Sequence, residues 1–150
     1  RAQLLRVATF APDGRLHLLE AHVLYEILDR GRPVTDEGAL GELVATTLDT
    51  VMRPLIRYAL GDLVRLRARA CACGRPFRVI EYEGRARNTL AGPGGRPVTL
   101  RAIDRAIGAP AGVDFFRITA RSRGRANLEL VPSGSRGLVD RDRLVGALEA

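Results

Sequence analysis

The spacing of apolar and polar positions predicts that the first half of the chain is mostly β-structure. Apolar and polar residues alternate from Ala21 to Leu28, as in a strand with one buried face. The stretch from Gly41 to Leu48 is rich in Val and Thr, which favour strands. Turn signals such as Asp29-Arg30-Gly31 separate these stretches. The pattern therefore predicts strands at 15–28, 41–48, 53–58, 62–69 and 77–83.

After residue 88 the pattern changes to an alternation of strands and helices. A helix is predicted over 100–107, with Thr99 as its N-cap and Gly108 at its end. Its apolar face is formed by Leu100, Ile103 and Ile107. The other expected elements are a strand at 88–91, a hairpin turn at 92–95, a hairpin of 113–121 with 126–131, and a last helix capped by Asp140. A small sheet covered by two helices follows from this order.

Composition narrows the class of protein only slightly. The 150 residues are enough for one domain, or two small ones, with a buried core. No apolar run approaches the roughly 18 residues that span a membrane, and the start has no signal-peptide pattern, so we expect a cytoplasmic protein without a membrane partner. The net charge is +7 and every basic residue is arginine. Because these arginines are scattered and only 5% of residues are aromatic, nucleic-acid binding is a less favoured alternative.

The two cysteines form a Cys71-Ala72-Cys73-Gly74 segment. Outside an oxidising compartment, cysteines more often bind metal or remain free thiols than form disulfides, and neighbours at i and i+2 bridge poorly. A structural zinc site needs about four ligands, and His17 is the best third candidate. The interpretation is therefore a possible Zn²⁺ site of His17, Cys71 and Cys73, and the alternative is two ordinary thiols in a turn.

The stretch from Arg53 to Leu63 carries the most informative chemistry. Proline at position 54 starts an extended segment, and Gly61 permits a turn of the backbone without a Cβ clash. Asp62 then presents a carboxylate at the end of a rigid element. A carboxylate only accepts hydrogen bonds, so its two oxygens suit the paired hydroxyl groups of a ribose.

Three motifs in order give this chain a family resemblance. They are GELVATTL at 41–48, PLIRY at 54–58 and GDL at 61–63, followed by Gly84-Arg85. Their order and spacing resemble the AMP-forming adenylating enzymes, in particular the phenylacetate–CoA ligase-like branch, where the pattern runs GELVxTTL, PLIRYRTGDL and then a GR-containing hinge. The match covers most of residues 14–135 and corresponds to a C-terminal portion of those enzymes.

The resemblance implies a mixed fold, with a β-barrel-like segment followed by a small α+β domain. Residues 1–83 would end the large N-terminal domain, 84–88 would form the hinge, and 89–150 would form a mobile C-terminal domain that is truncated. The hinge residues would be Gly84, Arg87 and Asn88. Because the chain starts with Arg1, we expect a fragment or a processed product.

The resemblance also implies what the site binds. Asp62 would hold the ribose hydroxyls of ATP or AMP, with Arg85 and Tyr58 as further cofactor-binding residues. Mg²⁺ would screen the phosphates. The parent protein would use ATP to activate a small carboxylic acid as an acyl-adenylate and would pass the acyl group to CoA. The sequence identifies neither the acid, nor the final acceptor, nor the oligomeric state.

Several positions depart from the family pattern. Arg87-Asn88 stands where relatives have one or two aspartates, and Ala59-Leu60 replaces an arginine and a threonine of RYRTGD. Some relatives have a cysteine near position 11, where this chain has Ala11. The chain also lacks the lysine that relatives use for adenylation, and their phosphate loop and acyl pocket lie upstream. We therefore expect these 150 residues alone to be inactive, and the alternative function is a degenerate, non-catalytic binding or interaction module.

Overall fold

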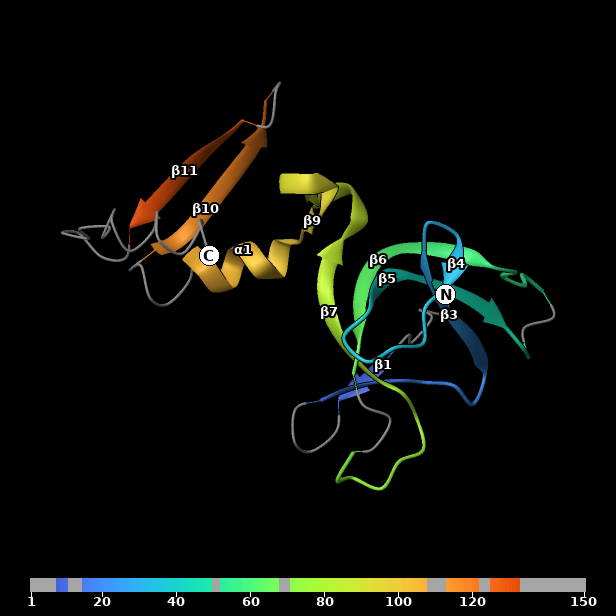
Figure 1. The fold of residues 1–150 in the computed structure, drawn as a ribbon. Helices are drawn as coiled ribbons and strands as arrows, with labels where there is room; N and C mark the ends of the chain where they lie inside the picture. The colour runs from blue at the N-terminus through green and yellow to red at the C-terminus, as the bar shows by residue number, and fades with distance from the viewer. Residues whose placement is uncertain are drawn as a thin grey trace. The chain divides into compact units, whose positions relative to one another are not determined.

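The computed structural model describes residues 8–10, 15–49, 52–67, 71–107, 113–121 and 125–132 (Figure 1). The chain divides into two compact units, Arg1–Arg87 and Asn88–Ala150. The boundary between them falls inside the segment 84–88, and each unit is described by itself below.

The first unit is built on one antiparallel sheet with the strand order β1-β2-β7-β6-β5-β3-β4. The strands are β1 Ala8–Phe10, β2 Leu16–Leu18, β3 Val23–Asp29, β4 Arg32–Pro33, β5 Leu40–Thr47, β6 Tyr58–Leu66 and β7 Val79–Arg85. Alternate side chains of β3 point into the core, because Val23, Tyr25 and Ile27 are buried while their neighbours are more exposed. This confirms a strand where the alternation was found, but the single strand predicted at 15–28 is two strands, β2 and β3, with a turn at 20–22 between them. Strand β5 confirms the strand predicted at 41–48.

The strand predicted at 53–58 is wrong, and the strand predicted at 62–69 is the second half of a longer strand that ends at Leu66. Residues 53–57 lie in bends and coil, and one continuous strand, β6, runs from Tyr58 to Leu66. Arg57 has a positive φ of 46°, which is incompatible with an extended strand. Gly61 does not end a strand: it has φ 72° and lies in a β-bulge inside β6. The expected turn at Gly61 is therefore a bulge.

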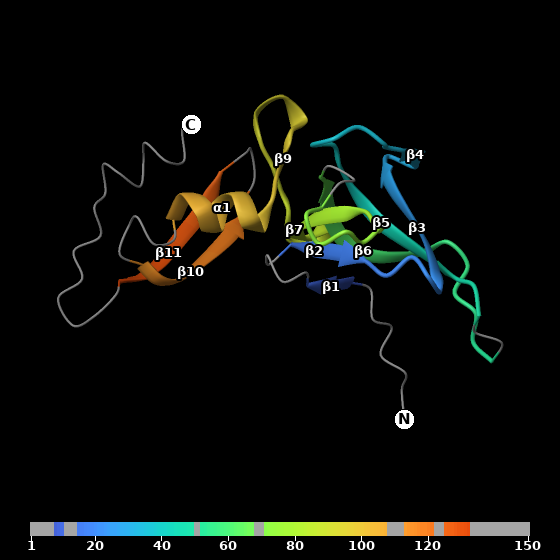
Figure 2. The same cartoon turned by 90° about the horizontal axis from the view of Figure 1, so that it is seen from below.

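The second unit contains two hairpins and one helix among its described residues (Figure 2). Its elements are β8 Leu90–Ala91, β9 Pro97–Val98, α1 Leu100–Ile107, β10 Val113–Ala120 and β11 Ala126–Pro132, with a short 3-10 turn at Pro93–Gly95. A second 3-10 turn, Ala86–Asn88, spans the boundary between the two units. The helix confirms its predicted bounds, and Thr99 Oγ1 accepts a hydrogen bond from the Ala102 amide at 3.2 Å as the N-cap. The segment 92–95 connects β8 to β9, which confirms the predicted hairpin turn.

The core of the second unit lies between α1 and the β10–β11 hairpin. Ile103 and Ile107 are buried there. Leu100 was expected on the same buried face, but it is 40% exposed. The residues packed against this pair are Leu90, Val98, Val113, Phe116, Ile118, Leu128 and Leu130. Gly108, the turn at 122–124 and the predicted last helix from Asp140 lie outside the described residues.

The described residues are thus mostly sheet with one α-helix. This agrees with a mixed fold, and the barrel-like character of the first unit stays a prediction. No helix within the described ranges is long and apolar enough to cross a membrane.

Candidate functional site

Asp62 lies in the bulged part of β6. Opposite β5, Leu63 pairs with Glu42 and Ala59 pairs with Val44, so three residues, 60–62, lie opposite one residue of β5. On its other side, Asp62 is the register partner of Arg85 at the end of β7. The bulge therefore interrupts regular pairing at the position where the carboxylate stands, as bulges often do beside functional residues.

The Asp62 carboxylate has two hydrogen-bond donors on the same oxygen. The Tyr82 hydroxyl donates to Oδ1 at 3.3 Å, and Arg85 Nη1 lies 3.1 Å from it as an ion pair. Arg85 Nη1 also donates to the Leu60 carbonyl at 2.8 Å, which ties the guanidinium to the bulge. We call Asp62, Tyr82 and Arg85 the Asp62 cluster.

A second bulge, in β7, places Tyr82 and Arg85 on the same exposed side. Gly84 pairs with Leu63 and Tyr82 pairs with Val64, so Glu83 is the extra residue. Along β7, Tyr82 is exposed, Glu83 and Gly84 are buried, and Arg85 is exposed again. In a regular strand, residues three apart would face opposite sides of the sheet. Gly84, with φ 118°, supplies the unusual backbone that makes this arrangement possible.

The surroundings of Tyr82 raise the pKa of its hydroxyl. Partial burial raises the pKa of Tyr82, the Asp62 carboxylate raises the same pKa further, and Arg85 opposes it. Tyr82 is therefore protonated at neutral pH and acts as a hydrogen-bond donor. Asp62, with a side chain 20% exposed, remains accessible from outside the protein.

Beneath the cluster, Glu83 is held by a partly buried ion pair. Arg65 Nε donates to Glu83 Oε1 at 3.0 Å, and the Glu83 side chain is only 4% exposed. Arg65 Nη1 also donates to the Gly38 carbonyl at 2.7 Å. The buried Glu83 is thus paired, as a buried charge requires, and it fixes the bulge next to Gly84.

Tyr58, the third expected cofactor-binding residue, lies elsewhere on β6. It begins the strand opposite Ala45 and is half exposed. The described contacts of Asp62 are with Tyr82 and Arg85, and Tyr58 is not among them. Just before it, Arg57 forms two hydrogen bonds to the Glu26 carboxylate, at 3.0 and 3.2 Å, which hold the left-handed residue in place.

The expected hinge residues follow β7 directly. Gly84 is the penultimate residue of the strand, and Arg87 and Asn88 are exposed in the short 3-10 turn Ala86–Asn88. Arg87 is the last residue of the first unit and Asn88 is the first of the second.

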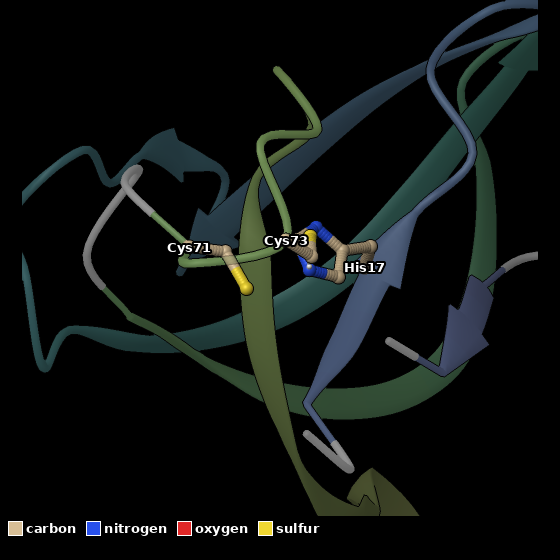
Figure 3. A group of neighbouring side chains, drawn as sticks. All are labelled: His17, Cys71 and Cys73. Carbon is tan, nitrogen blue, oxygen red and sulfur yellow. Dashed lines mark hydrogen bonds between the residues drawn. The ribbon is translucent and has the colours of Figure 1, made fainter. Parts of the chain in front are cut away.

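The structure also brings together the three candidate metal ligands (Figure 3). His17 comes from β2, and Cys71 and Cys73 come from the turn before β7. Their ligand atoms all lie within 4.8 Å of one another. His17 is fully buried, both cysteines are partly buried, and both are free thiols. Pairing of β2 with β7, which sets His17 opposite Val79, explains how residues so far apart in sequence meet.

The hydrogen bonds of His17 leave one ring nitrogen facing a thiol. Nδ1 lies 3.2 Å from the Phe77 carbonyl, which can only accept, so Nδ1 carries the hydrogen. Nε2 then presents its lone pair to Cys73 Sγ at 3.5 Å. Two ligands of a tetrahedral zinc ion, one sulfur and one nitrogen, are about 3.5 Å apart when the usual bond lengths are used. The donors present therefore fit three positions of such a site, and the Phe77 carbonyl orients the histidine ring through Nδ1.

Sequence reasoning missed Tyr82. Nothing in its immediate neighbours distinguishes it from an ordinary exposed strand residue, and its contact with Asp62 depends on two bulges. The sequence signal that could have pointed to Tyr82 was the nearby Gly84-Arg85 pair, which marks an irregular end of β7.

Comparisons with known proteins give a consistent result. No protein-family model matches the chain. The chain is 38% identical over 113 residues to a phenylacetate-coenzyme A ligase of Thermus thermophilus, and the match covers 72% of this chain and 25% of that protein. The chain therefore spans about a quarter of the length of this relative.

Two kinds of solved structure share the fold. A 2-hydroxyisobutyryl-CoA ligase in the postadenylation state, in complex with R3-HIB-AMP, matches with a TM-score of 0.67 at 24% identity, over 81% of this chain and 27% of that one. A mutant amide bond synthetase from Marinactinospora thermotolerans matches with a TM-score of 0.61 at 16% identity, over 91% of this chain and 28% of that one. Because both sequence identities are below 25%, the similarity to these structures shows a shared fold and no more.

Proposed function

Since the chain matches a C-terminal portion of the phenylacetate–CoA ligase-like branch of the AMP-forming adenylating enzymes, we propose that it supplies the nucleotide-holding carboxylate of such a ligase. The complete protein would use ATP to convert a small carboxylic acid to an acyl-adenylate and would then transfer the acyl group to CoA. The observation that carries this proposal is the Asp62 cluster, in which an accessible carboxylate is held by Tyr82 and Arg85.

The chemistry of the cluster suits the ribose of the nucleotide. A carboxylate can accept both hydroxyl protons of a vicinal diol, and hydrogen bonds to a charged acceptor are stronger than those between neutral groups. Arg85 Nη1 lies 3.1 Å from Asp62 Oδ1, so the guanidinium is placed to hydrogen-bond the carboxylate. Arg85 is itself 49% exposed, so its guanidinium can also reach a ribose hydroxyl or a phosphate. Tyr58 lies on the same strand as Asp62, and only its exposed ring would be available to contact the nucleotide.

The cofactors of this reaction are ATP or AMP, Mg²⁺ and CoA. In support, one solved ligase structure of this fold, at 24% identity and a TM-score of 0.58, is an open conformation in complex with 2-HIB-AMP and CoA. Mg²⁺ would neutralise the charge on the phosphates. We assign none of its ligands to this chain, whose part is to bind and orient the ribose.

We place the hinge of the ligase at 84–88, between domains at 1–83 and 89–150. In support, Gly84 has a φ of 118°, a backbone conformation open to glycine and rarely to other residues. The short turn Ala86–Asn88 follows it and contains Arg87 and Asn88. A hinge of this kind lets two faces of the enzyme act in turn on one bound intermediate.

We also propose that His17, Cys71 and Cys73 bind Zn²⁺ as a structural ion. After incubation with zinc and removal of excess metal, the complete gene product should hold about one zinc ion more than its Cys73→Ser variant, measured by mass spectrometry. His22→Ala is the matched control, because His22 is exposed and pairs with Asp49 at 2.8 Å instead of facing the cysteines. Equal zinc content in all three proteins would contradict the site.

The ligase function is tested by acid-dependent exchange of radioactive pyrophosphate into ATP. The complete gene product, supplied with ATP, Mg²⁺ and a panel of aryl and alkyl carboxylic acids, should show exchange with at least one acid and none without acid. Exchange with no acid would contradict the ligase and favour the alternative, a non-catalytic binding module. That alternative is favoured by the departures from the family motifs. Ala59-Leu60 replaces an arginine and a threonine, and Arg87-Asn88 stands where relatives have one or two aspartates.

A further inference from the structure

Tyr82 completes the carboxylate site, and we infer that it is a positioning residue that selects ribonucleotides through Asp62. By donating its hydroxyl to Asp62 Oδ1, it holds the carboxylate in one orientation and leaves the other oxygen for the vicinal diol of the ligand. This inference rests on the proposed nucleotide-binding function and adds to it the residue that sets the preference for a ribose with both hydroxyls.

Two hydrogen-bond donors converge on one oxygen of Asp62. Tyr82 and Arg85 both contact Oδ1, at 3.3 and 3.1 Å. The terminal torsion of an aspartate is broad and roughly two-fold, so one contact alone leaves the carboxylate free to rotate. Two donors on one oxygen fix that torsion. The second oxygen then keeps its lone pairs for an incoming hydroxyl group.

Arg85 alone does not fix the orientation of the carboxylate. Its Nη1 is shared between Asp62 and the Leu60 carbonyl, and the carbonyl contact is the shorter, at 2.8 Å against 3.1 Å. The guanidinium therefore compensates the charge of Asp62 while being anchored to the bulge. The Tyr82 hydroxyl adds a directed hydrogen bond without adding charge, and it approaches from a different residue of β7.

The Tyr82 hydroxyl is not needed for the fold of the first unit. Its side chain is 42% exposed, and it does not belong to the hydrophobic core of the first unit. Its backbone pairs with Val64 in the sheet, and this pairing is independent of the hydroxyl. Removal of the hydroxyl should consequently leave the fold intact and change only the contact with Asp62.

The test is a comparison of two nucleotides in two proteins. Calorimetry at neutral pH should give the affinities of the complete wild-type gene product and of its Tyr82→Phe variant for AMP and for 2′,3′-dideoxy-AMP. We expect AMP binding to weaken by about 3- to 10-fold in Tyr82→Phe, as for the loss of one hydrogen bond. Binding of dideoxy-AMP should stay unchanged, because this ligand has no diol for the carboxylate to hold.

A double-mutant cycle shows whether Tyr82 acts through Asp62. In an Asp62→Ala background, Tyr82→Phe should have no further effect on AMP affinity, because the group that it positions is gone. An equal loss in both backgrounds, or an equal loss for both nucleotides, would overturn the inference, since the ring would then act by itself or through the fold. Because this variant keeps the ring, an unchanged melting temperature is expected as the folding control.

The outcomes separate this inference from the proposed function. If the wild-type protein does not distinguish AMP from dideoxy-AMP, the ribose-binding role of the cluster is wrong, and the inference falls with it. If the wild-type protein distinguishes them and Tyr82→Phe distinguishes them equally well, only the role of Tyr82 is wrong.

Discussion

Tyr25 is an unusual residue in the core of the first unit. It is 3% exposed, and its hydroxyl has no hydrogen-bond partner among the described residues. Burial raises the pKa of Tyr25 to about 12, and the nearby Glu20 adds to the effect. A buried hydroxyl without a partner opposes folding, because it exchanges hydrogen bonds with water for none.

We predict that Tyr25→Phe leaves stability unchanged or raises it by about 1 kcal/mol, since it removes a desolvated hydroxyl and keeps the ring. The two proteins should also differ in alkali. The folded pKa of about 12 lies above the ordinary value of 10, so the folded state retains a proton that the unfolded state loses. The wild type should therefore lose stability as the pH rises from 10 to 12.

Urea unfolding of the complete gene product at pH 8 and above pH 10 measures both effects. Tyr25→Phe should lack the part of the alkaline loss that the wild type shows in that window. A loss of 2 kcal/mol or more at pH 8, which is roughly the cost of a broken buried hydrogen bond, would mean that the hydroxyl has a partner after all.

Some residues of the candidate site were predicted from the sequence and others were not. Asp62 and Arg85 were predicted as site residues because motifs of known order mark them, and the structure brings the two side chains into contact. Tyr82 was not found, because its contact with Asp62 requires the bulge at Glu83 and the register of β7 against β6. Such contacts depend on pairing between distant segments, and no local pattern encodes them. The meeting of His17 with Cys73 was proposed from their chemistry, and the pairing of β2 with β7 is what brings them together.

At the scale of elements, β6 and β7 carry the site together, and their ion pairs differ in burial. Arg65 pairs with Glu83, whose side chain is 4% exposed, beneath the bulge. Two residues later, Arg67 pairs with Glu81 nearer the surface, and Arg67 Nε lies 2.9 Å from Oε2. These two arginines allow the contribution of the buried pair to be compared with that of a similar, more exposed one.

We predict that Arg65→Met destabilises the protein by about 1–3 kcal/mol, because it takes a charged hydrogen-bond donor from the buried Glu83. The matched control is Arg67→Met, for which the exposed pair should cost at most about 1 kcal/mol. Urea unfolding midpoints of the two variants give the difference. Equal effects, or a larger effect of Arg67→Met, would show that the buried Arg65–Glu83 pair contributes no more to stability than the more exposed pair.

The elements also differ in how well local sequence predicted them. Helix α1 was predicted to the residue, because its N-cap Thr99 and its apolar spacing are local signals. The strand expected at 53–58 is absent, because Arg57 adopts a left-handed conformation that is held by Glu26 in β3. That contact joins residues 31 positions apart and is invisible to a local pattern. The same holds for the bulge at Gly61.

At the scale of the whole molecule, the chain corresponds to a part of a longer relative. It spans about a quarter of the phenylacetate-coenzyme A ligase that it resembles. In the proposed ligase, the described cluster contributes ribose binding, and other parts of the protein contribute the phosphate loop and the acyl pocket. The order of three motifs made the family recognisable from sequence, since order and spacing survive where single residues such as Ala59 and Leu60 have changed.

The measurement that tests the account most directly is AMP binding by the complete gene product and by its Asp62→Ala variant, using calorimetry. We predict that the wild type binds AMP and that Asp62→Ala loses about 1.5–3 kcal/mol, the range for hydrogen bonds to a charged group. Asp36→Ala is the control, because Asp36 is an exposed carboxylate in the turn before β5. This variant should bind AMP with the affinity of the wild type. Equal AMP affinity of the wild type and Asp62→Ala, or no binding by the wild type, would contradict the central claim that Asp62 holds the nucleotide.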